Sequence, residues 1–258
     1  MLGRNPARKS MEIDLAEVSS AFRAAHRKRA SRHAVSDRLR PGIFQYDYLG
    51  LSSLVADLER LIAAVPAGRA TDQGRPLALD LGCGKSPYRE LIEARGFALK
   101  TMDIDAGSAP NFIGTLEEND LPDDFADLVL CTQVLEHSDD PDRGIKSIFR
   151  ILRPGGHLIV SAPHIWFYHP HPSDNWRFTQ EGLTRLVVRR GFEPLRLISQ
   201  GGSALSYFQI VNFLVYGIAG RFGAPLFAVN NLIGRFADNL FRNDLFCLNF
   251  AILARKPA

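Results

Sequence analysis

The feature that most constrains the fold is a regular alternation of apolar runs and helical patterns between residues 77 and 199, punctuated by glycine and proline. Apolar runs predict strands at residues 77–82, 98–105, 126–133, 157–163 and 192–199. Helical spacing predicts helices between them at residues 88–95, 141–152 and 182–190. Nearly continuous apolar strands that alternate with helices form a parallel sheet covered on both faces. We therefore expect a doubly wound α/β fold, with a further strand at residues 245–256.

The segment before the first predicted strand is different in character. Residues 11–30 have loosely helical apolar spacing, and residues 51–65 predict a second helix that leads into a linker of small and polar residues. Ten Lys or Arg against four Asp or Glu make residues 1–40 basic. We expect an N-terminal helical cap over residues 1–75 and the α/β domain over residues 76–258. The Pro-Gly-Gly at residues 154–156 predicts a turn between helix and strand.

Composition excludes several classes of protein. With 46% apolar and 23% charged residues, the chain is neither disordered nor coiled-coil. A net charge of +3 is too close to balance for a dedicated nucleic-acid binder, so no nucleic-acid partner is expected. Three cysteines without close pairs indicate neither a disulfide framework nor a structural zinc site. Because the first residues lack an apolar signal region, we expect a cytoplasmic protein.

A glycine-rich turn follows the first predicted strand, in the sequence DLGCG (80–84). Glycines there let the backbone approach a ligand closely, and ligands of such sheets bind beyond the carboxyl ends of the strands. Asp103 ends the next strand, where a carboxylate can bind ribose hydroxyls. Pro87 replaces the third glycine of a dinucleotide fingerprint, and Asp80 would repel a pyrophosphate but attract an ammonium group. S-adenosylmethionine has the ribose and the positive charge that this pattern requires.

Five motifs in order extend this interpretation: DLGCG (80–84), MDID (102–105), LPDDFADLVL (121–130), VLEH (134–137) and RILRPGGHLIVSAP (150–163). With them the chain resembles the class I S-adenosylmethionine-dependent methyltransferases, particularly the small-molecule, type 11-like branch. The resemblance implies a Rossmann-like, mainly parallel sheet with a C-terminal antiparallel strand, and S-adenosylmethionine as the cofactor. It also implies that the enzyme transfers a methyl group to a small-molecule, glycan or lipid-linked acceptor.

The resemblance assigns roles to individual residues. Asp80, Gly82 and Gly84 face the methionine moiety, Asp103 the ribose, and Gln133 the methyl-bearing side of the cleft. Many relatives contact the adenine amine with an aspartate that has no counterpart at residues 114–116, so backbone groups near Leu116 are the expected adenine contacts. The full predicted cofactor set is Asp80, Gly82, Cys83, Gly84, Asp103, Ile104, Thr115, Leu116 and Gln133. We interpret Cys83 and Cys131 as small packing residues in preference to nucleophiles. For Glu136 and His137, orientation of the following loop is favoured over direct chemistry.

The acceptor side is predicted in the segment APHIWFYHPHPSDNWRFT (162–179), which directly follows a strand. His164, His169 and His171 are the candidate catalytic residues, because a hydroxyl acceptor needs a base and histidine titrates near neutrality. Two alternatives remain: the histidines bind a metal, or they hydrogen-bond the backbone of a proline-stiffened loop. No metal site is predicted, because no further ligand follows at a familiar spacing. An ion pair between Asp174 and Arg177 is expected to brace the loop.

An apolar insert, residues 200–244, separates the last two predicted strands. Residues 197–220 carry no charge, and Ser206, Gln209 and Asn212 draw a narrow polar stripe along an otherwise apolar helix. A second helix at residues 225–241 is expected to pair with it as a hairpin. Such helices must hide most of their surface, as a lid on the acceptor pocket, in a homodimer interface, at a membrane interface or across a membrane. The expected location is therefore cytoplasmic, with contact to the inner face of the membrane as an open alternative.

Two other functions remain compatible with the sequence. One is a catalytically silent, methyltransferase-like binding subunit that acts by docking its insert on a partner. The other is a nucleotide-dependent oxidoreductase, against which Asp80 and the missing third glycine argue.

Overall fold

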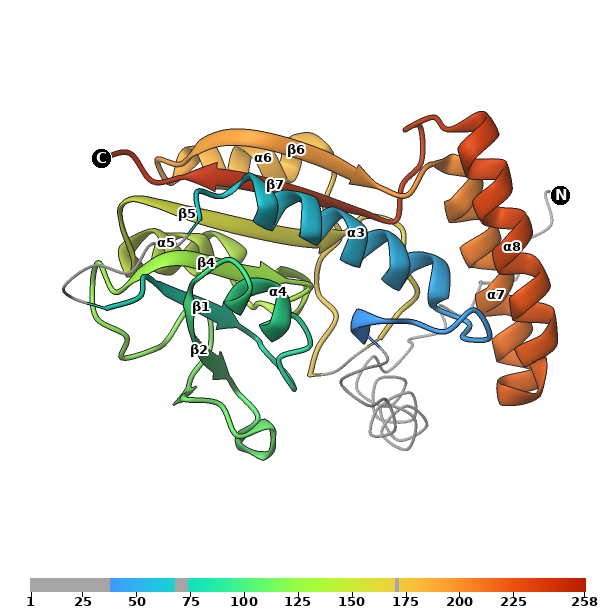
Figure 1. Cartoon of the computed structure of the whole chain (residues 1–258), viewed down its shortest axis with the longest axis horizontal. Helices are drawn as coiled ribbons and strands as arrows, with labels where there is room; N and C mark the ends of the chain where they lie inside the picture. The colour runs from blue at the N-terminus through green and yellow to red at the C-terminus, as the bar shows by residue number, and fades with distance from the viewer. Residues whose placement is uncertain (1–37, 68–73, 170–171) are drawn as a thin grey trace, which may run out of the picture.

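The computed structural model describes residues 38–67, 74–169 and 172–258 (Figure 1). The helix expected at residues 11–30 lies outside these ranges. In the described part of the chain one sheet contains β1 (Leu77–Leu81), β2 (Ala98–Asp103), β3 (Phe112–Ile113), β4 (Ala126–Thr132), β5 (Leu152–Pro163), β6 (Glu193–Gln200) and β7 (Asn249–Arg255). The strand order is β3-β2-β1-β4-β5-β7-β6. Strand β7 runs antiparallel to both neighbours, whereas the other pairs are parallel, which confirms the predicted fold class.

Helices cover both faces of the sheet (Figure 1). The helices are α3 (Tyr48–Ala64), α4 (Arg89–Glu93), α5 (Pro141–Ile151), α6 (Gln180–Arg189), α7 (Ser203–Ala219) and α8 (Ala224–Phe241). Short 3-10 turns occur at η1 (Ala106–Ser108), η2 (Leu135–His137) and η3 (Gly220–Gly223). Local sequence explains where α5 begins, because the Asp140 side chain accepts hydrogen bonds from two backbone N–H groups of the first turn and Pro141 lies within that turn.

Two hydrophobic clusters lie on opposite faces of the sheet. One packs α5 and α6 against the strands, through residues such as Ile148 and Val187. The other packs α3 and α4 against the opposite face, through residues such as Leu58 and Ile92. Because α3 shares its cluster with the strands, residues 48–64 belong to the layers of the α/β domain, although they fall within the predicted cap. The boundary at residue 75 stays a prediction.

The predicted turn at residues 154–156 is wrong. Strand β5 already begins at Leu152 and runs through these residues to Pro163. Its register with β4 shifts between Ala126 and Leu128, and Gly155 has φ +78° while its N–H donates to the carbonyl of Lys256. A local irregularity in the ladder therefore accommodates the glycine pair without ending the strand.

Helices α7 and α8 form the predicted hairpin, with η3 as the turn between them. The pair lies beyond the end of the sheet at which the parallel strands finish (Figure 1). Its polar stripe, formed by Ser206, Gln209 and Asn212, is buried, whereas many of its apolar side chains are exposed. Within the described part of this single chain nothing covers these apolar side chains, and what hides them stays a prediction.

Candidate active site

The glycine turn after β1 has a backbone shape that only glycine adopts easily. Gly82 and Gly84 have φ values of +63° and +49°, in the left-handed region. A Cβ on Gly82 would lie 2.5 Å from the Val134 side chain, whereas a Cβ on Gly84 would meet open space. The N–H of Gly84 donates to Asp103 at 2.7 Å, so the turn and the end of β2 are held together. The open side of Gly84 leaves the backbone accessible to a ligand.

A cavity of about 370 Å³ lies at the carboxyl ends of the parallel strands. Seven of the nine predicted cofactor residues border it, namely Gly82, Gly84, Asp103, Ile104, Thr115, Leu116 and Gln133. Gln133 has φ +56°, an uncommon value for a residue other than glycine, and its N–H and side chain both hydrogen-bond Ser161. Backbone strain of this kind gathers at functional sites. Contacts between these seven residues and a cofactor stay predictions.

Asp80 and Cys83 do not border the cavity. Asp80 is only 2% exposed, and its Oδ2 has no hydrogen-bond partner. Burial raises the pKa of the Asp80 carboxyl to about 7, and the nearby charge of Asp103 adds to this effect. An unpartnered carboxylate oxygen behind an open glycine turn fits a cationic ligand such as S-adenosylmethionine. Cys83 is a buried free thiol, in agreement with a packing role.

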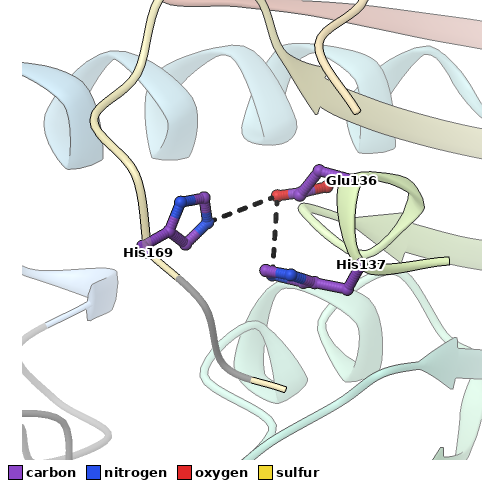
Figure 2. Close-up of side chains that lie close together, drawn as sticks. All are labelled: Glu136, His137 and His169. Atoms are coloured by element: carbon purple, nitrogen blue, oxygen red, sulfur yellow. Dashed lines mark ion pairs between the residues drawn. The ribbon is translucent and has the colours of Figure 1, made fainter. Parts of the chain in front are cut away.

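A second group of ionisable side chains, Glu136, His137 and His169, borders the same cavity. Figure 2 shows these three side chains. Glu136 and His137 come from η2, directly after β4, and His169 comes from the segment after β5. The Oε1 atom of Glu136 lies 3.9 Å from Nε2 of His137 and 4.0 Å from Nε2 of His169. These separations are longer than hydrogen bonds. The three residues therefore form a compact cluster whose groups do not satisfy one another.

The Glu136 side chain is fully buried, and neither of its carboxylate oxygens has a hydrogen-bond partner. Burial raises the pKa of Glu136 to about 7, although the nearby His169 opposes the rise. Burial also lowers the pKa of His137. A carboxylate with these properties changes its protonation state near neutral pH, as a general base should.

The segment that carries His169 is fixed on η2 by hydrogen bonds. The backbone N–H of His169 donates to Asp174, whose carboxylate also pairs with Arg177. Burial alone would raise the pKa of Asp174, but the hydrogen bonds from Arg177 and His169 hold it well below its usual range. The predicted ion pair is thus confirmed. The carbonyl of Glu136 accepts from the N–H groups of Asn175 and Trp176, and His137 contacts the Ser173 carbonyl, which gives η2 the loop-orienting role predicted for it.

The three predicted catalytic histidines have different fates. His169 borders the cavity. His164 does not, and its Nδ1 lies 3.0 Å from the carbonyl of Phe178. His171 lies outside the described residues. The metal alternative built on these histidines includes His171 and therefore stays a prediction. In the described residues, ligand atoms of Glu136, His137 and His169 lie within 4.8 Å of one another. One carboxylate with two imidazoles is a donor set that zinc and similar cations bind.

Sequence reasoning missed part of this site. The sequence favours a loop-orienting role for Glu136 and His137 over direct chemistry, although their place after the carboxyl end of a parallel strand is a signal for a site. Trp166, Gly50 and Leu54 also border the cavity. A Cβ on Gly50 would lie 2.7 Å from the Trp166 ring, so the indole rests directly on α3. No sequence signal marked α3 as a cavity wall.

Fold and site together define the class of protein. A doubly wound sheet carries, at the carboxyl ends of its strands, a cavity bordered by the glycine turn and the acid that the resemblance assigns to S-adenosylmethionine. This is the architecture of a class I S-adenosylmethionine-dependent methyltransferase. The profile of the methyltransferase domain family matches residues 55–197, more than half of the chain. The chain therefore belongs to that family, which confirms the resemblance.

Curated relatives match the chain over part of their length. A ubiquinone biosynthesis O-methyltransferase of Pseudomonas fluorescens is 32% identical over an alignment of 102 residues, and the match covers 33% of this chain and 43% of the relative. A protein of Mycolicibacterium smegmatis named as an S-adenosylmethionine-dependent methyltransferase is 30% identical over 131 residues, 45% of this chain and 51% of the relative. The matches thus span about half the length of these relatives.

Solved structures share the fold at low identity. An S-adenosylmethionine-dependent methyltransferase from Mesorhizobium loti has a TM-score of 0.52 at 15% identity, covering 80% of this chain and 99% of the other. A geranyl diphosphate methyltransferase in complex with geranyl diphosphate and sinefungin has a TM-score of 0.53 at 12% identity, covering 80% and 78%. These neighbours confirm the Rossmann-like fold. Together with the family, they support S-adenosylmethionine as the cofactor.

Proposed function

We propose that this chain transfers the methyl group of S-adenosylmethionine to a hydroxyl oxygen of a small-molecule, glycan or lipid-linked acceptor. The acceptor binds in the part of the cavity between Glu136 and Trp166, and the cofactor binds against the glycine turn and Asp103. A hydroxyl acceptor agrees with the relatives named for O-methyl transfer. The observation that carries the proposal is the buried, unpartnered carboxylate of Glu136, because methylation of a hydroxyl requires a group that takes its proton.

The chemistry balances with the residues at hand. When bound, S-adenosylmethionine would supply a methyl group on a sulfonium for attack by the acceptor oxygen, with the neutral sulfide of S-adenosylhomocysteine as the leaving group. The hydroxyl proton passes to the Glu136 carboxylate, which accepts it readily because burial raises its pKa to about 7. His169 lies beside this carboxylate and is the second candidate base.

The walls of the acceptor part favour an apolar or aromatic body. Trp166 and Leu54 both border the cavity. The Trp166 ring packs edge-on against Phe213 with ring centroids 5.0 Å apart, which fixes the orientation of the indole. A flat ring or an isoprenoid chain matches such a wall better than a charged group does. Of the three acceptor classes, we therefore expect a lipid-linked acceptor or an aromatic small molecule in preference to a glycan.

The test is methyl transfer to a catechol that carries a short prenyl chain, followed as formation of S-adenosylhomocysteine. We expect Glu136→Gln to lower turnover by about a hundredfold or more without weakening binding of S-adenosylmethionine. Glu118→Gln is the matched control, since that side chain is 79% exposed and does not border the cavity. Wild-type turnover should rise as pH increases through about 7, and this rise should vanish in Glu136→Gln. Full turnover in Glu136→Gln would exclude Glu136 as the base.

The same assay separates the remaining alternatives. Loss of turnover on addition of a chelator, restored by a divalent cation, would assign the Glu136, His137 and His169 cluster to metal binding instead of direct proton transfer. A silent binding subunit would bind S-adenosylmethionine without turnover of any acceptor, and Asp103→Ala would then leave biological activity unchanged. Stabilisation by a nicotinamide dinucleotide in place of S-adenosylmethionine would favour an oxidoreductase.

A further inference from the structure

In the hairpin of α7 and α8 the polar side chains face the protein and the apolar side chains face outward. The sides of α7 and α8 that face the protein bury polar residues, namely Ser206, Gln209, Asn212, Asn231 and Asp238. The opposite side carries large apolar residues. We call the outward side of residues 207–246 the outer face; its exposed side chains include Tyr207, Leu214, Ile218, Phe222, Leu226 and Phe236. Soluble proteins place these two kinds of residue the other way round.

Hydrogen bonds fix this orientation. The Gln209 amide accepts from the N–H of Gly50 at 3.0 Å and donates to the carbonyl of Tyr46 at 2.7 Å. The Asn231 amide donates to the carbonyl of Ile43 at 2.7 Å. Turning either helix to bury its apolar side would leave these buried groups without partners, which is costly. These hydrogen bonds therefore keep the outer face exposed.

The outer face is most exposed at the tip of the hairpin, where Ile218 is 90% and Phe222 is 81% exposed. It extends along α8 to the segment after it, where Leu245 and Phe246 are also exposed. Patches of this extent on a single chain mark contact with a partner or a membrane. No residue of α7 or α8 borders the described cavity, so the hairpin does not act as its lid.

The charges on the hairpin distinguish between the two remaining occupants. Across residues 203–246 the exposed charged residues are Arg221, Arg235, Arg242 and Asp244. A symmetric contact between two copies would place this face against itself and bring arginines together. The anionic surface of a phospholipid bilayer instead attracts them. Ten basic against four acidic residues in the first 40 positions add to that attraction.

Length and composition also bear on how deeply the hairpin enters a membrane. Among the described residues, one helical segment, Ser203–Phe241, is long and apolar enough to be a candidate span, and 17% of its most apolar window is buried. The segment is broken by η3, and α7 alone is about 26 Å long at about 1.5 Å per residue, less than the roughly 30 Å hydrocarbon core. The buried amides also tie one side of the hairpin to α3. The hairpin is therefore suited to lie in the interface and not to cross it.

We infer that the outer face of α7 and α8 binds the surface of an anionic phospholipid bilayer, with its apolar side chains at the level of the headgroups and upper acyl chains. The contact is independent of the chemistry at the cavity. It nevertheless has a consequence for it, because α7 holds Gly50 and Trp166, two residues of the acceptor wall. A bound hairpin thus brings the acceptor side of the cavity close to the membrane.

The test is sedimentation of the full chain with vesicles of phosphatidylcholine mixed with phosphatidylglycerol, compared with phosphatidylcholine alone. We expect the wild-type chain to bind the anionic vesicles. In the double variant Ile218→Glu and Phe222→Glu this binding should fall at least about tenfold, because each aromatic or aliphatic side chain that enters the bilayer contributes strongly to partitioning. Val188→Glu with Leu195→Glu is the matched control, since these exposed apolar residues lie on α6 and β6. Added salt should weaken binding.

Each outcome decides the question. Retained thermal stability and S-adenosylhomocysteine binding in the double variant would show that its loss of vesicle binding is local to the hairpin. Failure of the wild-type chain to sediment with anionic vesicles would overturn the inference, as would equal binding of wild type and double variant. Equal binding to both vesicle types would overturn the anionic preference. A wild-type dimer that the double variant dissociates, without vesicle binding, would assign the outer face to a second copy.

Discussion

The buried Glu136 carboxylate predicts opposite effects of one substitution on activity and on stability. The pKa of Glu136 rises from 4.5 to about 7 in the folded chain because burial disfavours its charge. Between these two values the folded chain keeps a proton that the unfolded chain has released. The free energy of unfolding therefore falls as pH rises through this window. At about 1.4 kcal/mol per pKa unit, the ionised carboxylate lowers it by about 3 kcal/mol above pH 7.

Replacing Glu136 by Gln removes this penalty, so the stability of the variant relative to wild type should increase by about 3 kcal/mol between about pH 4.5 and pH 8. For a chain of this size that corresponds to about 6–12 °C in the unfolding midpoint. Urea unfolding, followed by fluorescence of Trp166 and Trp176, measures the difference at each pH. The change of this stability difference with pH reports the charge of Glu136, because a packing difference between Glu and Gln contributes equally at every pH.

Asp80 has the same kind of shift but is unchanged in the variant, so it cancels from the comparison. Glu118→Gln is the control and should follow wild type at every pH, since the Glu118 side chain is exposed. A constant difference between Glu136→Gln and wild type from pH 4.5 to pH 8 would refute the reasoning. It would mean that solvent or a bound cation compensates the charge in the folded chain.

Three further predictions test the cofactor side and the hairpin. Gly84→Ala should reduce S-adenosylmethionine affinity in calorimetry, while its backbone conformation lowers stability by only about 1 kcal/mol. Gly82→Ala should lower stability more, because its Cβ meets Val134. Equal losses of stability of the two variants in thermal melts would contradict this. Affinity for S-adenosylmethionine should rise as pH increases from about 6 to 8, as Asp80 ionises, and Asp80→Asn should abolish the rise in titration calorimetry. Asn231→Ala should lower the free energy of unfolding by about 1–3 kcal/mol in urea unfolding, because it leaves the partly buried backbone carbonyls of Ile43 and Gln45 without this partner. An unchanged value would show that the amide does not hold the hairpin.

Much of the fold and of the cofactor side could be predicted from local sequence. The alternation of strands and helices defines the sheet. Asp103 ends β2, and the glycine turn directly follows β1. Because parallel strands end at the same edge, residues next to their carboxyl ends gather there without further information. Seven of the nine predicted cofactor residues consequently border one cavity. His164 follows a strand in the same way, yet hydrogen-bonds Phe178 because the path of its segment is not a local property.

The sequence by itself determined the order of strands and helices along the chain, the place of the glycine turn and the narrow polar stripe on an otherwise apolar α7, since each depends on neighbours along the chain. Only the tertiary structure decided that Glu136 is buried without a partner beside His169, that α3 forms a cavity wall, and that the polar stripe of α7 faces inward. These outcomes depend on contacts between residues far apart in sequence, such as Gly50 with Gln209. Periodicity shows that a helix has two unlike sides, but the partners available in the folded chain determine which side is buried.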